Sequence, residues 1–157
     1  MTTTTTHVEP HTAAPAKPAA RYGQAGARML MGLVFFVFGL NGFLHFIPQP
    51  KDAMSQGAMD FFSGLMKTGY MIPLIFGTQT LVGALLLINR FVPLALALIA
   101  PVIVNIIAFH IFLSPSTIAP GIVVLVLELY LAWSYRKVFQ PMLEFRSKPS
   151  AGQHPSE

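Results

Sequence analysis

Six polar side chains stand inside or at the ends of long apolar runs, and their types could do chemistry. They are Asn41, His45, Gln79, Asn105, His110 and Glu128. Asn41 and His45 are four residues apart, so a helix would place both on one face. Amide and imidazole groups bind neutral ligands through hydrogen bonds, and imidazole and carboxyl groups can also exchange protons. The six residues predict either a polar binding site within an apolar protein or a set of contacts between helices.

The composition requires a lipid bilayer as the main solvent. Of 157 residues, 54% are hydrophobic and only 10% are charged, whereas soluble domains carry roughly 25% charged residues. The net charge of +4 does not indicate a nucleic-acid partner, because the basic residues stand at the ends of the apolar runs. The chain has no cysteine, which excludes disulfides and thiol chemistry within it, and we predict no metal site.

Four apolar runs are each long enough to approach the length of a membrane span. They cover about 28–47, 70–88, 92–113 and 118–135. Segment 51–68 is too short and too polar to span, and its patchy apolar face predicts a short helix at the membrane interface. We therefore expect an all-α protein, a four-helix transmembrane bundle over residues 25–140. Residues 1–24 and 141–157 are predicted to be disordered tails.

The basic residues predict the orientation of this bundle. Eight of the ten lysines and arginines precede the first span, separate the second from the third, or follow the fourth. Only Lys51 and Lys67 lie in the other two connections. The positive-inside rule then places both termini in the cytoplasm.

The depth of each polar group follows from its distance to the cytoplasmic basic residue of its helix. At about 1.5 Å per residue, Glu128 lies about 12 Å deep and the two histidines about 25 and 30 Å deep, with the three amides between. A carboxylate in hydrocarbon is costly, so we expect Glu128 to be protonated, paired or facing a cavity. It could fix helix register, or it could accept protons or bind a ligand. An ion pair would require Arg136 to reach back.

Three interpretations of His45 and His110 stay open. Axial ligation of a b-type haem is the least favoured, because one pair without a flanking pattern is a weak signal. Hydrogen bonding to a quinone head group is the second. The third is that both histidines cap helix ends or bond to Asn41 or Asn105. Amides such as Gln79 are more often contacts between membrane helices than ligand groups.

Several stretches resemble the DoxX family of small bacterial inner-membrane proteins. They are GLVFFVFGLNGFLHFIPQP, GYMIPLI, GALLLINRFVPLALALIAPVIVNIIAFHIFL and LELYLAWSYRKVF. The resemblance extends from Arg28 to about Phe139, and it implies a multi-pass protein with four membrane helices and cytoplasmic termini. Relatives include a subunit of a thiosulfate:quinone oxidoreductase and membrane partners of oxidative-stress and thiol-redox systems. The family offers no agreed catalytic motif to place on these positions.

Three functions fit these observations. The first is a quinone- or redox-linked membrane subunit that uses the six polar residues. The second is a non-catalytic assembly or scaffold protein of an envelope redox or stress-response complex, with Met54–Met66 docking a membrane or periplasmic redox protein. The third is a small transporter or proton channel, which would need a homo-oligomer and lacks the internal repeat of many transporters. Whether the chain is an enzyme stays open.

Overall fold

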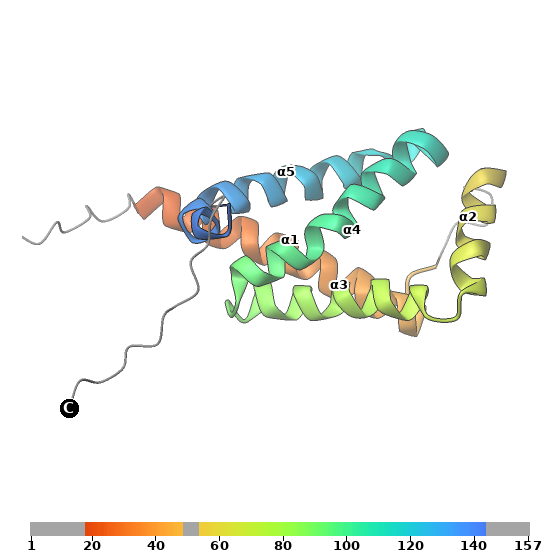
Figure 1. Ribbon diagram of the computed structural model, residues 1–157, viewed down its shortest axis with the longest axis horizontal. Coiled ribbons are helices and arrows are strands. Elements are labelled where there is room, and N and C mark those ends of the chain that lie inside the picture. Colours follow the sequence, from red (N-terminus) through yellow and green to blue (C-terminus); the bar gives the residue numbers. More distant parts are fainter. Residues whose placement is uncertain (1–17, 49–53, 144–157) are drawn as a thin grey trace, which may run out of the picture.

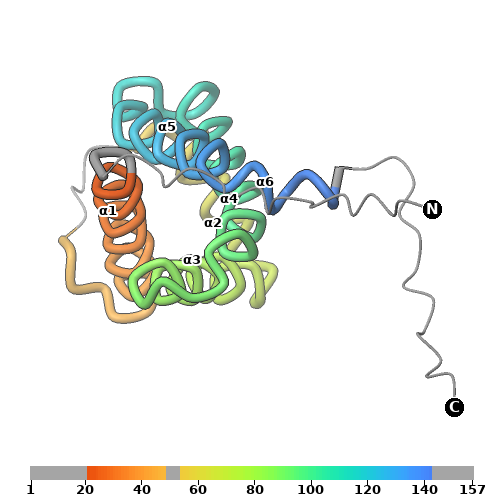
Figure 2. The backbone as a smooth tube through the Cα atoms, turned by 90° about the vertical axis from the view of Figure 1, so that its left-hand side faces the viewer, coloured from red at the N-terminus to blue at the C-terminus, as the bar shows by residue number. Residues whose placement is uncertain are grey.

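The structure is a computed structural model that describes residues 18–48 and 54–143, and over these residues it contains helices and no strand. The elements are α1 (Pro18–Leu44), α2 (Gln56–Lys67), α3 (Met71–Leu87), α4 (Val92–Leu113), η1 (Pro115–Thr117), α5 (Ala119–Ser134), α6 (Arg136–Phe139) and η2 (Gln140–Leu143). The four long helices α1, α3, α4 and α5 lie alongside one another, and α2 stands across one end of them (Figure 1). Seen along the bundle, they follow one another in the ring order α1, α3, α4, α5 (Figure 2).

Two or three helices in the described part of the chain are candidate membrane spans. Arg21–Leu44 of α1 and the whole of α4 are long and apolar enough to cross a bilayer. Helices α2 and α3 pass the same test only together, as one span broken by a bend of 93°. Helix α5 is apolar but has 16 residues, which gives it a length of about 24 Å.

The boundaries of the long helices agree with the predicted runs except in α1, and residues 141–143 of the predicted C-terminal tail belong to η2. Helices α3, α4 and α5 begin and end within one residue of the predicted runs. Helix α1 begins at Pro18, inside the predicted tail, because alanine-rich sequence there continues the helix. It ends at Leu44 because His45 has a left-handed backbone, with φ of 52°, and a left-handed residue ends a helix. Residues 1–17 and 144–157 of the predicted tails lie outside the described residues.

Helices α1 and α3 form the closest pair in the bundle. A methyl group added at Gly39 would lie 2.5 Å from the backbone nitrogen of Thr80, and one at Gly83 would collide with the backbone of Phe36. Small residues at a helix interface allow this approach, as they do in many membrane proteins. The pair forms one rigid wall of the bundle.

One half of the bundle is filled by buried apolar side chains, which we call the inner core. They are Met31, Phe35, Val82, Leu86, Val92, Ala95, Leu96, Ile99, Ile103, Val124 and Leu131. Most belong to the first half of α4 and the second half of α3, and α1 contributes Met31 and Phe35 from its middle. In the same half, the Arg28 guanidinium donates to the carbonyl of Leu86 and so ties α1 to the end of α3.

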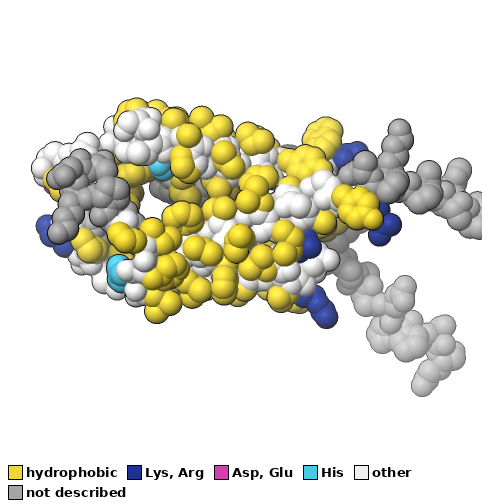
Figure 3. Space-filling model, turned by 180° about the vertical axis from the view of Figure 1, so that it is seen from behind, with side chains coloured by type: hydrophobic (Ala, Val, Ile, Leu, Met, Phe, Trp, Pro, Cys, Tyr) yellow, Lys and Arg dark blue, Asp and Glu magenta, His cyan; other side chains and the backbone are white. Residues whose placement is uncertain are grey.

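The other half of the bundle is open between the pairs α1/α3 and α4/α5, and a hollow is visible there from behind (Figure 3). Helix α2 crosses this open end. Its N-cap Ser55 accepts a hydrogen bond from the Ala58 amide at 3.2 Å and donates one to the carbonyl of Leu113 at 2.6 Å. The far end of α2 turns into α3 through Gly69, whose φ of 75° favours glycine. Helix α2 is therefore attached to both α4 and α3.

Candidate functional site

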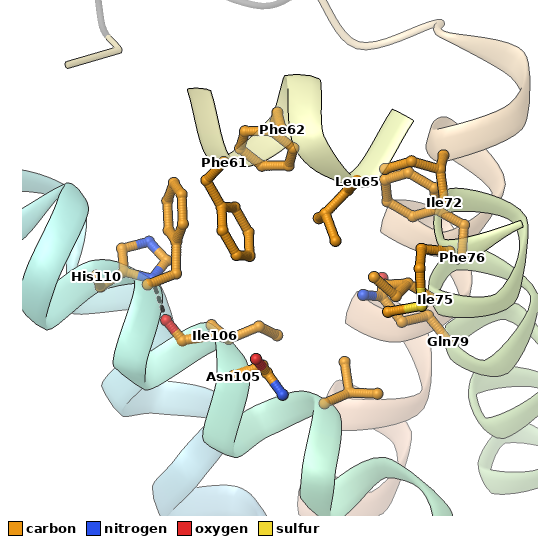
Figure 4. Close-up of a pocket in the computed structure, with 13 residues that line it drawn as sticks. Phe61, Phe62, Leu65, Ile72, Ile75, Phe76, Gln79, Asn105, Ile106 and His110 are labelled. Atoms are coloured by element: carbon orange, nitrogen blue, oxygen red, sulfur yellow. Dashed lines mark hydrogen bonds between the residues drawn. The ribbon is translucent and has the colours of Figure 1, made fainter. Parts of the chain in front are cut away.

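The first cavity lies under α2, between α3 and α4, and we call it the α3/α4 cavity (Figure 4). Its volume is about 360 Å³. Ten of its thirteen lining residues are aromatic or aliphatic, and the three polar ones are Gln79, Asn105 and His110. A mostly apolar wall with a few polar groups at this volume is typical of a small-molecule site.

The second cavity lies between α1 and α5, and we call it the α1/α5 cavity. Its volume is about 550 Å³. Asn41, Ser114 and Thr117 add polar groups to its wall. The lining residues common to both cavities are Phe62, Phe76, Gln79, Ile106, Phe109 and His110. The two spaces therefore share one wall, to which Gln79 and His110 contribute the only polar side chains.

Gln79 is the least satisfied polar group of this shared wall. Its side chain is only 7% exposed, and its amide makes no hydrogen bond to any residue in the described ranges. Figure 4 shows the amide directed from α3 into the space opposite α4. The Gln79 amide is thus placed to bind a ligand within the cavity.

His110 is held by its own helix. Its Nδ1 lies 2.7 Å from the carbonyl oxygen of Ile106, and its ring packs edge-on against Phe109, with 5.4 Å between the ring centroids. Because the Ile106 oxygen can only accept, Nδ1 carries a proton. The ring is partly buried and lines both cavities.

The other two amides have local partners. Asn105 is exposed at the rim of the α3/α4 cavity, and its Nδ2 donates to the carbonyl of Pro101 at 3.2 Å. Asn41 is 7% exposed, and its Oδ1 accepts from the backbone N–H of Ile47 at 2.6 Å. Asn41 therefore closes the end of α1 while it lines the α1/α5 cavity.

His45 and Glu128 lie outside the lining of both cavities. His45 follows the end of α1 and is exposed, so the two histidines do not share a cavity. Glu128 is 7% exposed and stands between Val124 and Leu131 on the inner-core face of α5. Its Oε2 is buried and has no hydrogen-bond partner among the described residues. The six polar residues therefore do not form one continuous set. Four of them line the cavities, Glu128 lies in the inner core, and His45 is exposed at the end of α1.

Arg136 does not reach back to Glu128. Its guanidinium donates to the carbonyl of Trp133 at 3.1 Å and lies over the indole ring, 4.9 Å from the ring centroid. The ion pair that the sequence left open is not formed.

Sequence reasoning did not foresee the aromatic roof of the cavity. Phe61 and Phe62 of α2 pack against Phe109 of α4, with ring centroids 5.6 and 5.3 Å apart. The available signal was the i, i+4 pair Phe61 and Leu65, which gives α2 an apolar face. That face turns toward the bundle and covers the polar groups of α3 and α4.

No protein-family model, curated protein or solved structure matches this chain. The cavities and their polar groups therefore provide the argument for function.

Proposed function

We propose that the chain is a DoxX-like, four-span protein of the bacterial inner membrane that binds a quinone as a redox-linked subunit. Helices α1, α3, α4 and α5 alternate in direction, because each connection joins two helices at the same end of the bundle (Figure 1). Helices shorter than the bilayer can be accommodated by local thinning, which allows α3 and α5 to cross with their 17 and 16 residues.

The described basic residues favour cytoplasmic termini. Five of them lie at the end of the bundle that holds the inner core, and Lys67 lies at the end covered by α2. The five are Arg21, Arg28, Arg90, Arg136 and Lys137. This asymmetry follows the positive-inside rule.

Cysteine labelling tests this orientation, since the chain has no cysteine of its own. Met59 on α2 and Val138 on α6 are both exposed. An impermeant maleimide added to spheroplasts should label Met59→Cys and should label Val138→Cys only after lysis. Labelling of both positions from the same side would contradict the four-span topology.

The observation that supports a quinone most strongly is the Gln79 amide, which is directed into a mostly apolar cavity and makes no hydrogen bond within the described residues. The lining of the α3/α4 cavity contains no charged side chain, which suits a neutral head group. Asn105 is exposed at the rim, so the cavity opens beside α4 on a surface that lipid would cover. A ligand dissolved in the bilayer can then enter from the side.

The inner core argues against a continuous transport path. Its side chains are at most 6% exposed, and they fill the half of the bundle that faces the cytoplasm in the proposed orientation. A ligand site that opens to the outer half agrees better with this closed end than a proton channel does.

Solvent extraction and mass spectrometry of protein purified in mild detergent test the quinone site. We expect a stoichiometric quinone in the wild type and in His45→Asn, whose changed residue lies outside both cavities. Gln79→Met preserves side-chain length, removes the amide and should lose most of the quinone. Absence of an enriched quinone from the wild type would contradict the proposal and would favour the scaffold function, in which Met54–Met66 docks a partner.

A further inference from the structure

In its neutral form, with Nδ1 donating to the Ile106 carbonyl, the His110 ring offers a ligand a hydrogen-bond acceptor and no donor. Its Nδ1 proton is donated to the Ile106 carbonyl, as Figure 4 shows. The neutral ring has one proton, so Nε2 presents a lone pair. No N–H or O–H group within residues 18–48 and 54–143 donates to Nε2. Nε2 of this ring can therefore accept a hydrogen bond from a ligand.

The other polar groups of the cavity, Asn105 and Gln79, do not donate a hydrogen bond to His110 Nε2. The Asn105 amide is also folded back on α4, toward the carbonyl four residues earlier, which leaves its Oδ1 and one amide hydrogen. The Gln79 amide can donate or accept. The neutral His110 ring is thus the polar group of the cavity that can only accept a hydrogen bond from a ligand, whereas each amide can donate or accept one.

We infer that the cavity binds the quinol form more tightly than the quinone form, an inference that rests on the proposed quinone site. Both quinone oxygens only accept hydrogen bonds, so a quinone oxygen facing Nε2 would leave it unpaired. A quinol hydroxyl donates to Nε2. The second oxygen of the same ring points away from the first, toward the opposite side of the cavity, where α3 places the Gln79 amide.

The expected preference is about tenfold, because a buried acceptor left without its donor weakens binding and His110 is only partly buried. Tighter binding of the reduced form stabilises it. A tenfold preference would therefore raise the midpoint potential of the bound two-electron couple by about 30 mV.

The test is anaerobic calorimetry of the purified protein in alkaline buffer, with a decyl-substituted benzoquinone and with its chemically reduced quinol. We expect the quinol to bind about tenfold more tightly to the wild type. His110→Leu should weaken quinol binding and bring the ratio close to one. His110→Gln, whose side-chain oxygen can accept, should keep part of the preference, and His45→Asn should keep all of it.

The outcomes separate the inference from the proposed function. Equal affinity for the two forms, or tighter binding of the quinone, would overturn the inference and leave the quinone site in place. Binding of neither form would overturn both. The ratio in the wild type decides between these outcomes even if His110→Leu does not fold.

Discussion

The two halves of this bundle are built from similarly apolar sequence but are packed in different ways. In the inner half, aliphatic side chains of four helices meet directly, and the core is closed. In the outer half, the helix pairs separate, and Phe61 and Phe62 of α2 cover the gap in place of a neighbouring long helix. The comparison teaches that a cavity can form in a small helix bundle where a short transverse helix replaces direct packing.

The largest effect is expected where α1 and α3 touch. Gly83→Leu should destabilise the protein by at least about 2 kcal/mol, because the new side chain meets the backbone of Phe36, which cannot move aside. Gly77→Leu on the same helix is the control, since a methyl group there meets nothing within 4 Å. Thermal unfolding in detergent measures both. Similar stabilities of the two variants would contradict the close α1/α3 contact.

Truncation of matched isoleucines compares the two halves directly. Ile99 is fully buried in the inner core, whereas Ile75 lines the α3/α4 cavity. Ile99→Ala should cost about 3 kcal/mol and Ile75→Ala about 1 kcal/mol, because less packing is lost beside an existing cavity. Chemical unfolding of both variants in the same detergent gives the two values. Equal losses would mean that the outer half is as tightly packed as the inner half.

Replacement of Gln79 and of Glu128 by methionine should have different effects on stability and on quinone binding. Gln79→Met and Glu128→Met each replace a buried polar end with an apolar one of similar length. Glu128→Met should raise the stability of the ligand-free protein by about 1 kcal/mol, because Oε2 is buried without a partner among the described residues. Gln79→Met should change the stability by less, because the Gln79 amide borders the cavity. Only Gln79→Met should lose quinone, since Glu128 does not line the cavities. A large destabilisation by Glu128→Met would show that its carboxyl has a partner.

The smallest effect is expected at the end of α1. His45 holds a left-handed backbone, with φ of 52°, which favours glycine at the residue that follows a helix. His45→Gly should therefore raise stability by about 0.5 kcal/mol and leave quinone binding unchanged. Differential scanning measurements on wild type and variant check the first part, and the extraction assay checks the second. Loss of quinone in this variant would place His45 in the site.

The sequence predicted the helices better than the site. The limits of α4 could be read from the sequence because an apolar run stands between Arg90 and the polar turn that begins at Ser114. The end of α1 could not, because it depends on the backbone of His45 and on the hydrogen bond that Asn41 accepts from Ile47. The spacing of residues in the sequence does not predict a left-handed backbone conformation or a hydrogen bond of this kind.

Depth along the helices identified three groups that line the α3/α4 cavity: Gln79, Asn105 and His110. It also placed Glu128 and His45 in the same series, because residue counting gives depth and gives no helix rotation. The roof formed by α2 needed the 93° bend between α2 and α3, which is a property of the folded chain. The sequence thus names the polar residues as candidates, and the structure shows which of them line the same cavity.

The most direct test of a quinone site in the outer half is photoaffinity labelling with an azidoquinone in native membranes, mapped by peptide mass spectrometry. We predict adducts on Phe61, Phe62 or Phe109, which line the α3/α4 cavity, and we predict that excess unlabelled quinone suppresses them. Adducts confined to lipid-facing positions such as Leu129, which is 61% exposed, and unaffected by excess quinone would contradict the account.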